Sequence, residues 1–361
     1  MTQPLTWALV VATYQREQIL PLCLKLAVEQ TRPPVEVIVV DASDHWEQTR
    51  DRVLAEIAKD HPKIRWEYVA AKQRGLPLQR NQGLDLATAD IVFLIDDDSL
   101  MYPDCAEQIM RVYEADSALR VVGVQAALAE AMPTETAVQD DAKPVGWKQN
   151  QWTMKINPVQ HFVWKNIFLM NNEVTCIPYY GTFPQHDVPA EVGALNVHPM
   201  RLFHGCRMTY RREVIGQERF EPLLLYYALN EDMDASYRVS KHGLLLEAGD
   251  AQLFHCQSNS GRLSRYVVTV LSLLNQAVCV RRYSDDLKRD RRRFYVLMVR
   301  RILSEFCKDG LSRRWDFPQL RGVLTGFRYA PIAFRLPLEE LTQWYPQFQK
   351  AFVETGKPPV T

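Results

Sequence analysis

The sequence predicts an α/β protein in which helices flank an open sheet and a helical extension follows. Three short apolar runs rich in β-branched residues, at 8–13, 36–41 and 91–95, indicate buried parallel strands. The segments between them place apolar residues three or four positions apart, as amphipathic helices do. From residue 262 onward the helical pattern continues without strand-like runs, which gives the C-terminal extension.

The elements of the sheet follow one another in a regular order. The first strand is followed by a helix at 17–29, which Pro33 and Pro34 end, and by the second strand. A helix at 46–59, a strand at 65–69 and a helix at 78–87 lead to the strand at 91–95. Further on, we expect a strand at 206–211, a helix at 232–242 and two short strands within 244–255.

Composition and charge exclude several classes of protein. The 361 residues include 43 Lys and Arg and 43 Asp and Glu, so the net charge is zero and a general nucleic-acid binder is disfavoured. Seven scattered Cys residues show no zinc-ligand spacing, which favours reduced thiols in the cytoplasm. The N-terminus lacks the charge pattern of a signal peptide, and the longest later apolar stretch, 267–280, is too short to span a bilayer.

Three adjacent carboxylates, Asp96, Asp97 and Asp98, follow the strand at 91–95. Like charges this close repel one another, so a bound cation would stabilise them. In an extended chain Asp96 and Asp98 point the same way and could hold Mg²⁺ or Mn²⁺, which usually also binds substrate phosphates. A solvated acidic turn that caps the next helix is the alternative. The nucleophile loop of haloacid-dehalogenase-like phosphatases is disfavoured, because Leu100 stands where that loop needs Thr or Val.

Two further groups of residues could carry chemistry. Glu231 and Asp232 begin the helix predicted near 232–242, where either the helix dipole or a role as general base would explain a carboxylate. His255 ends a strand-like run, where it is either structural or a metal ligand. The sequence pattern around each residue leaves both explanations open.

Taken together, these motifs resemble the GT-A family 2 glycosyltransferases over residues 7–265. The first strand ends in Thr13-Tyr14-Gln15-Arg16, and the second in Val39-Val40-Asp41-Ala42-Ser43, where the family's second Asp is Ala. The stretch from Gly75 through Arg80-Asn81 to Gly83, the Asp triplet with Pro103, and Gly205 with Arg211-Arg212 come next. Glu231-Asp232, Arg238, Gly243 and His255 complete the set in the family's order.

The resemblance implies a Rossmann-like GT-A fold with a mixed sheet and assigns roles to residues. The nucleoside and diphosphate side of the donor site would use Thr13, Tyr14, Arg16, Asp41, Arg74 and Arg80. Asp96 and Asp97 would lie near the ribose and donor sugar, while Asp98 and His255 would bind Mg²⁺ or Mn²⁺. Asp232 would be the catalytic base, and Glu231 would position the acceptor.

The implied activity is a metal-dependent, inverting transfer of a hexose from a nucleotide-diphosphate sugar to a hydroxyl of a saccharide or lipid-linked glycan. A UDP-sugar is favoured, and a dTDP-rhamnose-type donor is the alternative. A sugar-1-phosphate nucleotidyltransferase would need a glycine-rich loop after the first strand, which is absent. A non-catalytic sugar-nucleotide binder would not require both acidic motifs together with His255. The expected domains are 1–260, with a nucleotide-sugar half at 1–125 and an acceptor half at 126–260, and the extension 261–361.

The zero net charge hides an uneven distribution. Residues 262–328 contain 16 Lys and Arg against 6 Asp and Glu, a local charge of +10. Basic helices with apolar faces can lie on anionic membranes, which suits a cytoplasmic enzyme at the inner face of the cell membrane. A helical cap with ordinary ion pairs is the alternative.

Overall fold

The computed structural model describes residues 4–133, 162–163, 166, 178–226, 228–256 and 263–359. It divides the chain into two compact units. Unit 1 consists of Met1–Gly146, Pro184–Phe220 and Ala235–Ser260, and unit 2 consists of Trp147–Phe183, Glu221–Asp234 and Gly261–Thr361. Unit 2 thus takes two segments from within residues 1–260, and the predicted division into domains stays a prediction. The assignment of donor and acceptor halves stays a prediction.

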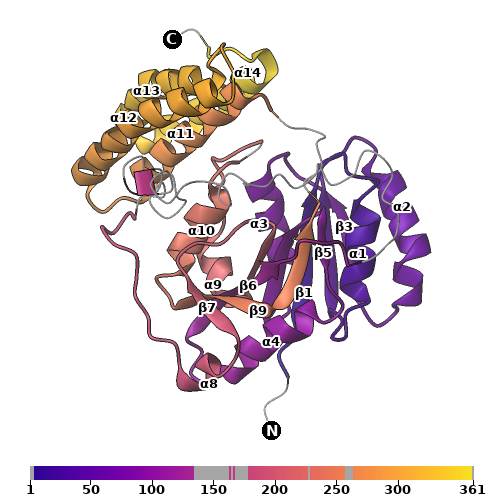
Figure 1. Ribbon diagram of the computed structural model, residues 1–361. Helices are drawn as coiled ribbons and strands as arrows, with labels where there is room; N and C mark the ends of the chain where they lie inside the picture. Colours follow the sequence, from indigo (N-terminus) through magenta and orange to yellow (C-terminus); the bar gives the residue numbers. More distant parts are fainter. Residues whose placement is uncertain are drawn as a thin grey trace. The chain divides into compact units, whose positions relative to one another are not determined.

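Unit 1 is built on a nine-stranded sheet with the order β3-β2-β1-β4-β8-β6-β9-β5, in which β7 pairs with β9 (Figure 1). The first strands are β1 (Trp7–Thr13), β2 (Glu36–Asp41), β3 (Arg65–Ala70), β4 (Ile91–Asp96) and β5 (Ser99–Met101). The later strands are β6 (Val121–Leu128), β7 (Val197–Met200), β8 (Arg207–Arg211) and β9 (Leu244–His255). Strands β1 to β4 are parallel, while β8 runs antiparallel to β4 and β6. The predicted mixed sheet is therefore confirmed.

Helices cover both faces of this sheet. They are α1 (Leu20–Val28), α2 (Trp46–Glu56) with the 3₁₀ turn η1 (Ala58–Asp60), α3 (Leu76–Leu86), α4 (Cys105–Ala115), α8 (Ala190–Gly193) and α9 (Arg212–Glu218). Alternate residues of β1 serve the two faces: Leu9 packs in the same cluster as Leu24 of α1, and Val10 with Leu84 of α3. Burial on both faces explains why β1, β2 and β4 are continuous apolar runs.

The C-terminal part of the sheet differs from the prediction. Residues 244–255 were expected to form two strands, but they form the single strand β9. Along β9, Ala248 pairs with Ala126, and the next pair is Gln252 with Ala127. The intervening residues 249–251 form a bulge, so the polar Gly249-Asp250 segment bends the strand without ending it.

Gly83 allows α3 to approach β1 closely, because a Cβ at this position would lie 2.4 Å from Cγ1 of Val10. We expect Gly83→Ala to lower the free energy of unfolding by about 1–3 kcal/mol, although Ala favours helix. Gly216→Ala in α9 is the matched control, because nothing lies within 4 Å of its added Cβ. Urea denaturation of both variants measures the difference. Equal stability of the two variants would contradict this packing.

Unit 2 contains four long helices, α11 (Arg265–Tyr283), α12 (Leu287–Leu311), α13 (Pro318–Arg335) and α14 (Leu338–Thr355). They confirm the predicted helical C-terminal region. α13 packs against α11 and α12. Helix α10 (Glu231–Val239) begins in a segment of unit 2 and ends in a segment of unit 1. No helix within the described parts of the chain is both long and apolar enough to cross a membrane.

Candidate functional site

The carboxyl ends of β1, β2 and β4 lie level with one another. Thr13 pairs with Asp41 of β2, and Ala12 pairs with Asp96 of β4. The chain order changes direction here, since β2 and β3 lie to one side of β1 and β4 to the other. In open α/β sheets, ligands bind at such a switch point, beyond the carboxyl ends of the strands.

The short strand β5 brings Asp98 to His255. Ser99 of β5 is paired with His255 at the end of β9, and the backbone carbonyl of Asp98 accepts a hydrogen bond from the N–H of Cys256. The Ser99 hydroxyl donates to the carbonyl of Cys206 at 2.7 Å, which fixes the other side of β5. Two residues distant in sequence are thus held together by backbone pairing.

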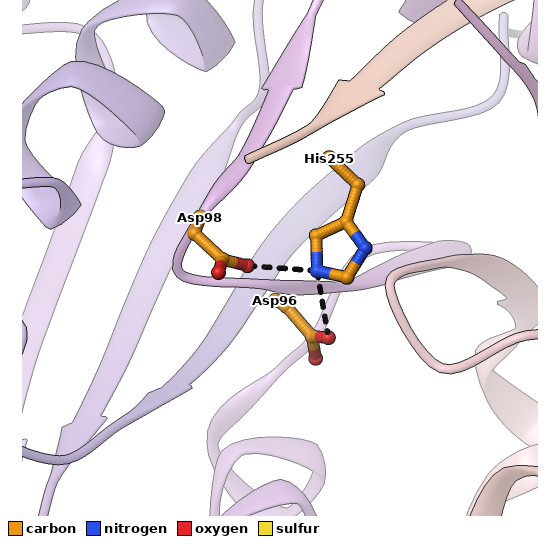
Figure 2. Close-up of side chains that lie close together, drawn as sticks. All are labelled: Asp96, Asp98 and His255. Atoms are coloured by element: carbon orange, nitrogen blue, oxygen red, sulfur yellow. Dashed lines mark ion pairs between the residues drawn. The ribbon is translucent and has the colours of Figure 1, made fainter. Parts of the chain in front are cut away.

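Asp96, Asp98 and His255 form a compact cluster (Figure 2). Nε2 of His255 lies 3.0 Å from Oδ1 of Asp98 and 3.8 Å from Oδ2 of Asp96. Burial disfavours the imidazolium, but the hydrogen bond with Asp98 and the contact with Cys206 raise the pKa of His255 to about 12. The Asp98 carboxylate therefore stabilises a positive charge on His255.

Asp97, between the two clustered carboxylates in sequence, is bonded to the end of β1. Its Oδ2 accepts a hydrogen bond of 2.6 Å from the Thr13 hydroxyl, and both residues are buried. Burial and the adjacent Asp98 carboxylate raise the pKa of Asp97 to about 8, while the Thr13 hydrogen bond and Arg16 oppose this rise. Asp97 therefore resists ionisation beside Asp98, and a cation at this point would relieve the repulsion between the two carboxylates.

Arg80 holds Asp96 in place. Its guanidinium donates to Oδ1 of Asp96 at 2.8 Å and to the carbonyl of Gly205 at 2.9 Å. The side chain lies over the ring of Phe220 and is 1% exposed. A buried, hydrogen-bonded guanidinium fixes the orientation of its carboxylate partner. The assignment of Arg80 to the diphosphate stays a prediction.

The loops after β1 and β3 bring Tyr14 and Arg74 together. The Arg74 guanidinium lies over the Tyr14 ring, 3.6 Å from its centre, and Arg74 is exposed. The loop that follows β1 is fixed at Gln15, which has a φ of 54° and whose N–H donates to the Ser43 hydroxyl. The pair presents an aromatic ring and a positive charge side by side.

Asp41 is buried at the end of β2. Its Oδ2 accepts a hydrogen bond of 2.6 Å from the Tyr68 hydroxyl, and its Oδ1 accepts one of 2.8 Å from the N–H of Ser43. Burial and Asp41 together raise the pKa of Tyr68. Tyr68 therefore remains a donor and orients the Asp41 carboxylate; the proposed contact of Asp41 with a base stays a prediction.

Glu231 and Asp232 belong to unit 2, at the start of α10. Glu231 is buried, whereas Asp232 is partly exposed and its Oδ1 accepts from the N–H of Met233. The backbone before the helix is strained, with positive φ values at Tyr226, Ala228 and Asn230. Strain of this kind in residues other than glycine is found most often at functional sites.

Helices α11 and α14 hold this strained segment by amide side chains. Asn275 donates to the carbonyl of Leu229 at 2.8 Å, and Asn230 donates to the carbonyl and hydroxyl of Ser272. Gln349 bonds both the N–H of Leu225 and the carbonyl of Leu223. The C-terminal helices thus fix the backbone that leads to Asp232.

Sequence reasoning missed several of these supporting residues. Gln79 donates to the carbonyls of Thr13 and Val40 at 2.9 Å each and so joins the ends of β1 and β2. Tyr68, Gln349 and Asn275 were likewise not singled out. The Gly75 to Gly83 stretch pointed to Gln79, since the residue lies inside it. The other three lie in ordinary strand or helix patterns, which carry no signal of a long-range partner.

The donor set of the cluster suits a divalent metal ion. Asp96, Asp98 and His255 each offer one ligand atom, and these atoms lie within 4.8 Å of one another. Carboxylate oxygens and an imidazole nitrogen are normal ligands for such ions. Asp96 joins the cluster in addition to the two predicted ligands.

Comparison with known proteins identifies the fold. A crystal structure of GalNAc-T7 with UDP, GalNAc and Mn²⁺ matches this chain with a TM-score of 0.50 and 14% identity, covering 80% of this chain and 50% of that chain. The mixed sheet, its flanking helices and this likeness define the class: unit 1 has the GT-A fold, as the sequence predicted.

Sequence comparison points to a family of enzymes. Residues 8–169 match the model of glycosyl transferase family 2, so this stretch of the chain is similar to that family. The protein EpsH of Bacillus subtilis (strain 168) is 29% identical over 106 residues, 29% of each protein. The glucosyl-dolichyl phosphate glucuronosyltransferase of Haloferax volcanii is 31% identical over 119 residues, which are 32% of this chain and 36% of that protein. The matches thus span about a third of each relative.

Proposed function

We propose that the protein is a metal-dependent, inverting glycosyltransferase that moves a hexose from a nucleotide-diphosphate sugar to an acceptor hydroxyl. One observation carries the proposal: two carboxylates and an imidazole converge at the switch point of a GT-A sheet. A structural acidic turn would not need His255 brought to Asp98 by a separate strand pairing.

Asp98 and His255, with Asp96 beside them, would hold the metal ion. The imidazole in this set favours Mn²⁺ over Mg²⁺, which prefers oxygen ligands alone. When bound, the ion supplies Lewis-acid stabilisation of the negative charge that develops on the departing diphosphate. The GalNAc-T7 structure that shares the fold contains Mn²⁺ and UDP.

The residues around the cluster would bind the donor. Tyr14 and Arg74 offer a ring and a charge for the nucleoside and diphosphate, with Arg16 nearby as a further cation near Asp97. Thr13 would hold the nucleoside, Asp96 and Asp97 would lie near the ribose and donor sugar, and Asp41 would accept from the imide N–H of uracil. Arg80, which donates a hydrogen bond to Asp96, would face the diphosphate.

Asp232 would take the proton from the attacking hydroxyl. It is the more exposed of the two carboxylates at the start of α10, as a base that must reach an acceptor needs to be, while the buried Glu231 would position that acceptor. One displacement, with the hydroxyl attacking opposite the leaving group, inverts the anomeric centre. A retaining route would need an additional nucleophile.

A UDP-sugar is the proposed donor, and a dTDP-rhamnose-type sugar is the alternative. The proposed acceptor is a saccharide or a lipid-linked glycan, in a cytoplasmic enzyme that builds polysaccharide or glycoconjugate. No partner of the nucleic-acid type is proposed, because the net charge of the chain is zero.

Thermal denaturation with nucleotide sugars tests the proposal. UDP-, dTDP- and GDP-sugars are each added with Mn²⁺, with Mg²⁺ and with EDTA. We expect a UDP-sugar with Mn²⁺ to raise the melting temperature most, because a ligand that binds only the folded state stabilises it. Release of UDP in the presence of acceptor glycans then separates an enzyme from a non-catalytic binder. No metal-dependent stabilisation by any nucleotide sugar would contradict the proposal.

A further inference from the structure

Helix α12 carries a stripe of exposed apolar side chains. Val296, Val299, Leu303 and Phe306 recur at intervals of three or four residues, so they lie on one face of the helix. Each is between 53% and 56% exposed. Single exposed apolar residues are common, but a continuous stripe of four on one helix marks a surface that binds something apolar.

The buried face of α12 contains carboxylates as well as apolar side chains. Asp290, Glu305 and Asp309 point inward and are buried, together with Phe294 and Met298. Their charges are compensated within unit 2: Asp290 pairs with Arg289 at 2.8 Å, and Asp309 accepts from backbone N–H groups at the start of α13. An ordinary surface helix would place its charges outside and its apolar residues inside. α12 departs from this pattern, because it buries three carboxylates and exposes the four apolar side chains of the stripe.

The apolar stripe continues beyond α12. Phe306 stacks on Phe317 at 5.4 Å with an interplanar angle of 7°, and Trp315, in the turn between α12 and α13, is 72% exposed. On α13, Phe327 contacts Tyr295 of α12, and Leu324 lies one turn before it on the same face. Both are exposed. We call this surface, from Val296 to Phe327, the α12–α13 apolar face.

Arginines border this face. Arg292 and Arg300 lie on α12 within one turn of Val296, and Arg313 lies two residues before Trp315. Among the described residues, these three arginines have no carboxylate partner, whereas Arg289, Arg293 and Arg301 pair with acidic residues. Cations without partners around an apolar, tryptophan-containing surface match a layer of anionic headgroups above acyl chains.

We propose that the α12–α13 apolar face docks on the surface of an anionic lipid bilayer. The apolar side chains enter the boundary between headgroups and acyl chains, and the bordering arginines contact lipid phosphates. The described helices rest on the bilayer and do not cross it, since none is long and apolar enough to do so. The inference rests on unit 2 alone and does not depend on the chemistry proposed for unit 1.

Flotation of the full chain with lipid vesicles tests this docking. Vesicles of phosphatidylcholine with 30% phosphatidylglycerol are compared with vesicles of phosphatidylcholine alone. We expect binding to the anionic vesicles that weakens as salt is raised. The variant Leu303→Glu/Phe306→Glu should bind on the order of a hundredfold more weakly, because it places two charges in the apolar face. Arg292→Gln/Arg300→Gln/Arg313→Gln should lose the preference for anionic lipid.

Leu54→Glu is the matched control, because Leu54 is an exposed Leu within helix α2 of unit 1. It should bind vesicles as the unchanged chain does. Circular dichroism checks that each variant keeps its helices, as we expect for substitutions of exposed or partly exposed side chains. Two results would overturn the proposal: equal vesicle binding by the Leu303→Glu/Phe306→Glu variant, or a dimer in sedimentation that this variant converts to monomer, which would assign the face to a second copy of the chain.

Discussion

Asp98→Asn is expected to lower the rate of sugar transfer by about a thousandfold. Asn keeps the shape of the side chain, but it removes a negative charge from a cluster whose ligand atoms lie within 4.8 Å of one another. Loss of a metal's stabilisation of developing charge is worth several kcal/mol, and each 1.36 kcal/mol changes the rate tenfold. The variant should also lose the rise in melting temperature that Mn²⁺ gives.

The change in melting temperature on adding Mn²⁺ separates metal binding from activity. Without added metal, the Asp98→Asn protein should stay folded, because the substitution also relieves repulsion between Asp97 and Asp98. Asp104→Asn, at the exposed start of α4, is the control and should keep both activity and the Mn²⁺ response. Unchanged stabilisation of Asp98→Asn by Mn²⁺ would exclude Asp98 as a ligand.

Asp232→Asn is expected to lower the rate of transfer by about 10²–10⁴-fold, the range of a general base, while the affinity for the nucleotide sugar stays nearly unchanged. The amide cannot accept the proton of the attacking hydroxyl. It can still accept the hydrogen bond from the N–H of Met233, so the start of α10 should be preserved. Initial rates and isothermal titration with donor and Mn²⁺ measure the two quantities separately.

Asp234→Asn is the matched control on the same helix turn. Asp234 is buried and accepts a hydrogen bond of 3.1 Å from the Tyr179 hydroxyl, which an amide oxygen can also accept. We expect less than about a tenfold loss of rate, since no group takes a proton there. Substantial sugar transfer by Asp232→Asn would show that Asp232 is not the base. A larger loss of rate for Asp234→Asn than for Asp232→Asn would show the same.

The sequence was informative where local pattern alone decides the structure. β1, β2 and β4 are buried on both faces, so their continuous β-branched runs predicted strands. Their carboxyl ends lie side by side, as the parallel arrangement requires. The helices of the first third of the chain were also predicted, and their observed ends differ from the predicted ends by a few residues. Helix α1 begins only at Leu20, with Pro21 in its first turn.

Long-range pairing could not be predicted in the same way. Nothing in the local pattern of residues 99–101 shows that Ser99 pairs with His255, because the partner of a short strand is chosen by the order of the sheet. The contact between Asp41 and Tyr68 depends on two neighbouring strands, and that between Arg80 and Asp96 on a helix and a strand. The order of the motifs predicted which residues belong to the candidate site, whereas the distances between their side chains follow only from the folded sheet.

The joining of β5 to β9 has a consequence for how the protein is made. Asp96 and Asp98 leave the ribosome long before His255, so a nascent chain holds two of the three clustered groups and lacks the third. Strand pairs between distant parts of a chain form late. A chain cut short before β9 therefore cannot complete the cluster, and the three groups come together only when the last strand of the sheet is in place.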